Sequence, residues 1–168
     1  MRIKDGVEQL IIDIRPEYSG GESPYYEYGR PTKIAALLSD KDDNDVLKYK
    51  KYPLVMLLQE FTEKRGGNLF ESDVPVTIVI VTAADPAIIS SDRDDENYNN
   101  VLYPIYYLFM EALRDSLLFD TSEELAHDLT ESPYWGKEGQ YGNTGNVMND
   151  TLDALFIENL NLKLLKTC

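Results

Sequence analysis

The sequence predicts an α+β fold in one domain that covers residues 1–168. Apolar residues recur with helical spacing over residues 3–14 and 101–113, as in amphipathic helices. By contrast, residues 52–58 and 74–82 are apolar at almost every position, which is typical of strands buried on both faces. With 43% of its residues hydrophobic, a chain of this length can bury a core without disulfides.

The first part of the chain, residues 1–24, is expected to form a helix and a loop ahead of an α+β core at residues 25–168. Pro16 ends the helix, because proline cannot continue a hydrogen-bonded turn. Residues 16–33 mix Pro, Gly, Ser and tyrosines, and we expect a loop followed by an extended segment. The helical stripe consists of Ile3, Val7, Leu10, Ile11 and Ile14.

The next segments alternate between apolar and charged. Residues 34–38 are apolar and fit either a strand or a helical turn, and the charged residues 40–51 read as a loop. We predict a central strand at 52–58 with Pro53 at its start, where a missing N–H is best tolerated. Residues 62–73, with two adjacent glycines, are predicted to form a turn.

The clearest strand is 74–82, which is β-branched almost throughout. A polar connection at 90–100 should lead into a helix from residue 101, with Pro104 either in its first turn or at a kink. Residues 133–151 are rich in Gly, Asn and Tyr and predict a long exposed loop. Leucines then alternate with polar residues from Leu160 onward, which predicts a half-exposed strand at a sheet edge.

Charge is the strongest global feature, with 16 basic and 30 acidic residues and a formal charge of −14. Such a surface repels phosphate backbones and anionic lipids, so we expect neither broad nucleic-acid binding nor a membrane partner. The single cysteine, Cys168, permits no intrachain disulfide. No signal peptide or membrane span is recognisable, so the protein is expected in the cytoplasm unless a particle carries it out.

The sequence offers little catalytic chemistry. His127 is the only histidine, and although a general base beside Asp128 or Glu131 is conceivable, we interpret it as a surface residue. Two acidic runs, 40–45 and 92–96, resemble the start of a calcium-binding loop but lack its glycine and its final glutamate. No phosphate-binding glycine motif occurs. We therefore expect no catalytic residue, no metal and no cofactor.

Tyrosine is unusually frequent, with 12 residues against five phenylalanines. Tyrosine combines apolar area with a polar tip and is enriched at protein interfaces. The alternative is that many of these rings pack at the edge of the core while their hydroxyl groups remain in contact with water. The residues predicted to lie at a protein interface are Tyr25, Tyr26, Tyr28, Tyr134, Trp135 and Tyr141.

The order of motifs resembles a known family. From about residue 25 onward the chain presents, in order, an aromatic-glycine segment, two apolar strands, a helix that opens with Asn-Asn and Tyr-Pro, a Tyr-Trp-Gly loop and a closing strand. These segments are residues 26–29, 52–58, 74–82, 99–106, 134–136 and 155–164. This order is similar to that in neck and tail-completion proteins of tailed bacteriophages, the tail-terminator and head–tail-joining group, especially in phages of Bacteroidetes hosts.

The resemblance implies an antiparallel sheet of about four strands packed against one or two helices, with long loops. It also implies a structural virion subunit that assembles with copies of itself into a ring in the head–tail connector or at the tail terminus. Portal, neck or tail proteins would be its partners, and DNA would pass through the ring without specific binding. The acidic surface fits a channel that must not hold DNA. Assembly would take place in the host cytoplasm and the final location would be the virion.

Two other readings remain open at this point. One is a cytoplasmic adaptor domain that binds a protein partner through its tyrosine-rich loops. The other is a small enzyme that uses scattered carboxylates such as Asp92, Asp94 and Glu96, although no nucleophile or cofactor cradle accompanies them.

Overall fold

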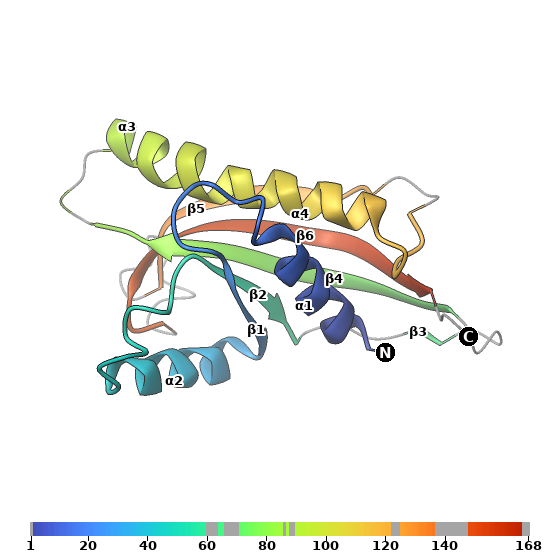
Figure 1. Ribbon diagram of the computed structural model, residues 1–168, viewed down its shortest axis with the longest axis horizontal. Coiled ribbons are helices and arrows are strands. Elements are labelled where there is room, and N and C mark those ends of the chain that lie inside the picture. The colour runs from blue at the N-terminus through green and yellow to red at the C-terminus, as the bar shows by residue number, and fades with distance from the viewer. Residues whose placement is uncertain are drawn as a thin grey trace.

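The computed structural model describes residues 2–59, 64–65, 71–85, 87, 90–121, 125–136 and 148–165. Helices and strands alternate irregularly along the chain, which confirms the predicted α+β class (Figure 1). The elements are α1 (Ile3–Ile14), β1 (Tyr25–Gly29), α2 (Pro31–Asp42), β2 (Leu54–Leu58), β3 (Lys64–Arg65), β4 (Glu71–Ala83), α3 (Ser90–Arg93), η1 (Asp94–Leu102), α4 (Tyr103–Asp115), β5 (Asp128–Gly136) and β6 (Thr151–Leu165).

The strands form one open, mixed sheet in the order β1-β2-β4-β6-β5, and the short β3 pairs with β4. All the neighbours are antiparallel except β1 and β2, which are parallel. The sheet therefore differs slightly from the predicted antiparallel sheet of about four strands, in its strand count and in one parallel pairing. The reason is local: β1 is followed by α2, and this helical crossover lets the chain return in the same direction.

Helices lie on both faces of the sheet (Figure 1). The helices α1, η1 and α4 pack on one face, where their apolar stripes meet alternate residues of β2, β4 and β6. On the other face α2 contributes Ile34, Ala35 and Leu38 to a smaller cluster with Trp135. The strands β2 and β4 are therefore buried on both faces, as their continuous apolar runs predicted.

Several predicted elements are confirmed with small shifts. The opening helix spans Ile3–Ile14, and its stripe is buried. The central strand β2 begins just after Pro53, and all five of its residues are buried. The clearest strand prediction, 74–82, lies within β4.

Other segments differ from their predictions. The ambiguous residues 34–38 are helical, because Pro31 opens α2 and its buried residues recur at helical spacing. The predicted loop 40–51 begins inside α2. The predicted turn 62–73 lies largely outside the described residues, although its last residues belong to β4.

The polar connection predicted at 90–100 is wrong, because this segment is helical. The α-helix α3 passes into the π-helical η1 and then into α4, so Pro104 lies in the first turn of α4. From residue 91 to the end of η1, Arg93, Tyr98 and Leu102 are buried, Asn97 and Val101 are half-buried, and the other side chains are exposed. A helix with so narrow a buried stripe carries a weak apolar signal, which explains the wrong prediction.

The exposed loop predicted at 133–151 is wrong at both ends. Residues 133–136 belong to β5, Met148 is buried, and Thr151 begins β6. Residues 137–147 lie outside the described part of the chain. The final strand is half-exposed over 160–165, as predicted. β5 pairs with the outer side of β6 only from Thr151 to Glu158, so the alternating leucines lie beyond β5, where an isolated bridge between Phe119 and Leu164 is the pairing found among the described residues.

Within the ranges that the structure describes, no helix is long and apolar enough to cross a bilayer.

Candidate protein-binding surfaces

The first group of predicted interface tyrosines lies on β1, the outermost strand at one edge of the sheet. Tyr25, Tyr26 and Tyr28 are all half-buried there. The Tyr26 hydroxyl donates a hydrogen bond to the Lys4 carbonyl oxygen at 2.9 Å, and burial raises the pKa of this hydroxyl. Tyr26 and Tyr28 pack toward the α1 face and Tyr25 toward the α2 face. The edge strand thus presents aromatic area on both faces.

The second group lies at the opposite edge, on β5. Tyr134 is half-buried, whereas Trp135 is 6% exposed and makes an edge-to-face contact with Phe156, with ring centroids 5.5 Å apart. Trp135 is therefore a core residue in this chain, and a partner would reach Tyr134 more easily. Tyr141 lies outside the described residues.

A buried polar cluster, which sequence reasoning missed, fixes β5 against the helix. Asp153 on β6 is fully buried and accepts hydrogen bonds from the Asn97 side chain at 2.7 Å and from the Tyr134 backbone N–H at 3.1 Å. Arg93 Nε lies 3.7 Å from Asp153 Oδ2, and the Arg93 guanidinium lies 4.3 Å from the centre of the Tyr134 ring. The cluster holds the β5 bulge at Tyr134, where φ is 54°.

A tyrosine patch on α4 was also missed as a surface. It contains Tyr103, Tyr106 and Tyr107, whose rings lie 5.1–6.4 Å apart. Tyr107 is 63% exposed. The i, i+3, i+4 spacing of these tyrosines was visible in the sequence and is the signal that could have predicted the patch.

Hydrogen bonds hold this patch against the start of β5. Tyr103 donates to Glu131 Oε1 at 2.6 Å, and this hydrogen bond, with burial, raises the pKa of Tyr103 to about 12. His127 Nδ1 lies 2.8 Å from the Leu125 carbonyl oxygen, which can only accept, so Nδ1 carries the proton. His127 Nε2 then accepts a hydrogen bond from Tyr106 at 2.9 Å. The histidine is engaged in positioning α4 and β5.

The acidic runs do not come together. In the first run, Asp42 accepts two hydrogen bonds from the buried ammonium of Lys51, each at 2.9 Å. Lys51 also contacts Asp150, so this cluster ties the end of α2 to the start of β6. In the second run, Asp92 and Glu96 are exposed along the helix. No group of three His, Cys, Asp or Glu side chains that could hold a metal ion occurs among the described residues.

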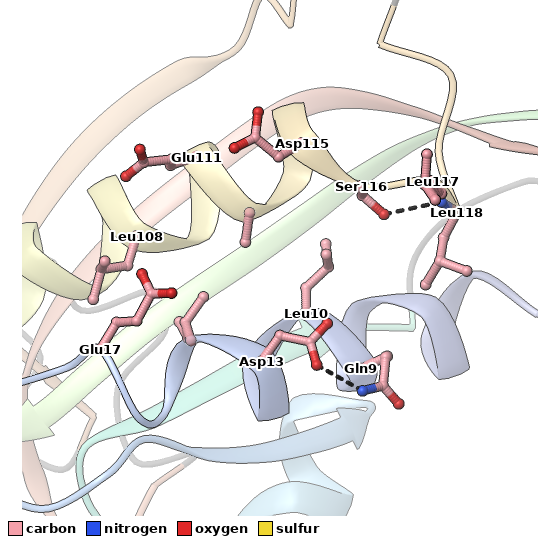
Figure 2. A pocket seen from close by; sticks show the side chains of 12 residues that line it. Gln9, Leu10, Asp13, Glu17, Leu108, Glu111, Asp115, Ser116, Leu117 and Leu118 are labelled. Carbon is pink, nitrogen blue, oxygen red and sulfur yellow. Dashed lines mark hydrogen bonds between the residues drawn. The ribbon is translucent and has the colours of Figure 1, made fainter.

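A depression with a volume of about 560 Å³ lies between two helices that run side by side, α1 and α4 (Figure 2). Its floor is apolar, and it includes the buried Leu10 and Ile14. Carboxylates stand along both sides of the depression: Asp13 and Glu17 on the α1 side, and Glu111 and Asp115 on α4. We call this feature the α1–α4 groove.

These features define the chain as an α+β protein with an open mixed sheet, two aromatic edges and one acidic groove. No protein-family model matches the chain, and no curated protein matches it.

Proposed function

We propose that this protein is a structural ring subunit of a phage neck or tail, in which identical copies associate head to tail around a DNA channel. The observation that carries the proposal is the position of the half-buried tyrosines on the two edge strands at opposite ends of the sheet order: Tyr25, Tyr26 and Tyr28 on β1 and Tyr134 on β5. Two different surfaces on opposite sides of one subunit are what a heterologous interface requires, and such interfaces close into rings when the rotation permits.

The composition of β5 supports an association through this edge. Residues 128–131 are exposed, and Leu129 is 38% exposed on a strand that pairs on one side only within the described part of the chain. An edge strand is a template for another strand or for a neighbouring surface. Pro133 limits the pairing to the first half of β5, because proline cannot donate to a ladder.

The charge supports a role beside DNA rather than on it. The formal charge is −14, and a strongly acidic wall repels phosphates. A channel of this kind lets a polyanion pass without binding it. The virion is then the expected location, with assembly in the host cytoplasm.

Substitution of the exposed apolar residue on the β5 edge tests the proposal. Leu129→Lys should lower the native mass from that of a ring to that of a monomer, because it places a desolvated charge in the contact. Val46→Lys, which makes the same change at a side chain 67% exposed after α2, should leave the ring intact. Light scattering coupled to size-exclusion chromatography reads out both masses. A ring that persists in Leu129→Lys would contradict association through β5, and a monomeric parent protein would favour the adaptor reading instead.

A further inference from the structure

The α1–α4 groove combines an apolar floor with an acidic rim. Leu108, Ala112 and Leu118 line it as half-buried apolar side chains, together with the buried Leu10 and Ile14. Leu117 stands at one end and is 85% exposed, the highest value among the large apolar side chains of the described residues. An apolar surface of this kind between two helices has the shape that accepts a third helix.

Among the described residues, the rim carboxylates have no cationic partner. Asp13 accepts a hydrogen bond from the neutral Gln9 side chain at 2.8 Å, and within the described ranges no Lys or Arg forms an ion pair with Asp13, Glu17, Glu111 or Asp115. No Lys or Arg lines the groove. Some acidic residues elsewhere do pair with lysines, as Asp42 does with Lys51. The groove thus concentrates negative charge that a bound partner can neutralise.

Neither a second copy of this chain nor one of its own remaining segments suits the groove. With 30 acidic and 16 basic residues, a second copy would bring more negative charge to the groove. Beyond the described residues the sequence contains only two basic residues, Lys137 and Lys166, and neither sits in an apolar stripe. The complementary occupant is therefore a different, basic protein segment.

We propose that the α1–α4 groove binds a basic amphipathic helix of another protein, with its apolar stripe on Leu108, Leu118 and Leu117 and its lysines or arginines against the rim. This inference does not rest on ring formation, because the groove lies on the helical face and the proposed ring contacts lie on the sheet edges. It assigns the chain a second surface, of a different chemistry, for a different component.

A synthetic helical peptide tests this proposal. The probe is a fluorescent peptide of about 18 residues, or five helical turns, with leucines at i, i+3, i+4 and i+7 and lysines on both flanks. Fluorescence anisotropy at near-physiological salt should show saturable binding to the full chain. Glu17→Lys with Asp115→Lys should weaken this binding by about tenfold or more, because two attractions become repulsions.

Three controls make the outcome decisive. Asp40→Lys with Asp43→Lys adds the same charge at exposed sites around the end of α2, and should change the affinity by about twofold at most. Leu117→Ser should weaken binding without a change of charge. A peptide of the same composition with its leucines scrambled should bind at least about tenfold more weakly.

No binding to the parent chain, equal binding of the scrambled peptide, or equal loss in both charge-reversal pairs would overturn the proposal. Retained native mass in Glu17→Lys with Asp115→Lys would separate this result from the ring test.

Discussion

Buried charged side chains hold several elements of this protein together. Asp153 sits between the buried Leu152 and Ala154 on β6, and it organises Arg93, Asn97 and the backbone of Tyr134. The sequence does not indicate this role, because a single aspartate in an apolar segment is just as consistent with an exposed side chain as with a buried one. Only the three-dimensional meeting of η1, β5 and β6 shows what it does.

Removal of this carboxylate should be costly. We expect Asp153→Ala to lower the free energy of unfolding by about 3–5 kcal/mol, because it leaves the 7%-exposed Arg93 as an uncompensated buried charge. Urea denaturation followed by circular dichroism measures the loss. The exposed Asp43→Ala should change stability by less than about 0.5 kcal/mol. Equal stability of the two variants would contradict the structural role of Asp153.

The hydroxyl of Tyr103 gives a residue-scale test by titration. Its pKa is raised from 10.0 to about 12, first by the hydrogen bond to Glu131 and then by burial. The folded state therefore holds this proton more tightly than the unfolded chain, and its contribution to stability is full below pH 10 and is lost as the pH rises toward about 12. Glu131→Gln should move the pKa of Tyr103 back toward 10, as followed by NMR of the tyrosine ring carbons. An unchanged pKa in Glu131→Gln would exclude Glu131 as the main cause.

At the scale of elements, what could be predicted depended on how much apolar surface each element buries. The helix α1 and the strands β2 and β4 were predicted because their apolar patterns are dense. Most of the β5 segment at 128–132 is polar and exposed, and no pattern in the sequence marks it as a strand. Because β5 was missed, the strand that pairs with β6 from Thr151 to Glu158 was missing from the predicted sheet.

The candidate surfaces follow the same logic. The tyrosines of β1 and β5 were predicted from composition, but their positions at opposite edges depend on strand order, which a single sequence does not specify. Trp135 was predicted to lie in an exposed loop, although it packs on Phe156. The α1–α4 groove was not predicted at all, because its four carboxylates come from two segments about 100 residues apart, whose packing brings them together.

The bulge in β6 offers an element-scale test. Val76 pairs with Leu160 and Ile78 with Ile157, so β6 carries one extra residue, and Asn159 adopts φ 58° there. The bulge keeps Leu160 and Ile157 on the same buried face. We expect Asn159→Val to destabilise the protein by about 1–2 kcal/mol more than Asn159→Gly, because only glycine adopts this conformation without strain. Both variants lose the side-chain hydrogen bond to Asp128, so their difference in urea denaturation isolates the backbone effect. A smaller loss for the valine variant would contradict the assignment of the bulge.

At the scale of the whole molecule, we propose three binding surfaces with two different kinds of partner. The two edges of the sheet, β1 and β5, serve contacts between copies, and the helical face carries the groove for a basic helix. The net charge of −14 makes self-association through like-charged surfaces unfavourable, so contacts between copies must rely on apolar and backbone groups at the edges. The aromatic residues on the edge strands supply such area.

The native mass of the purified chain over a range of concentrations, with negative-stain imaging of any large species, tests the central claim most directly. Our account predicts a mass that is a fixed multiple of 19.2 kDa and annular particles of one diameter. A strict 19.2-kDa monomer at every concentration, which stays monomeric when mixed with neck and portal proteins, would contradict it.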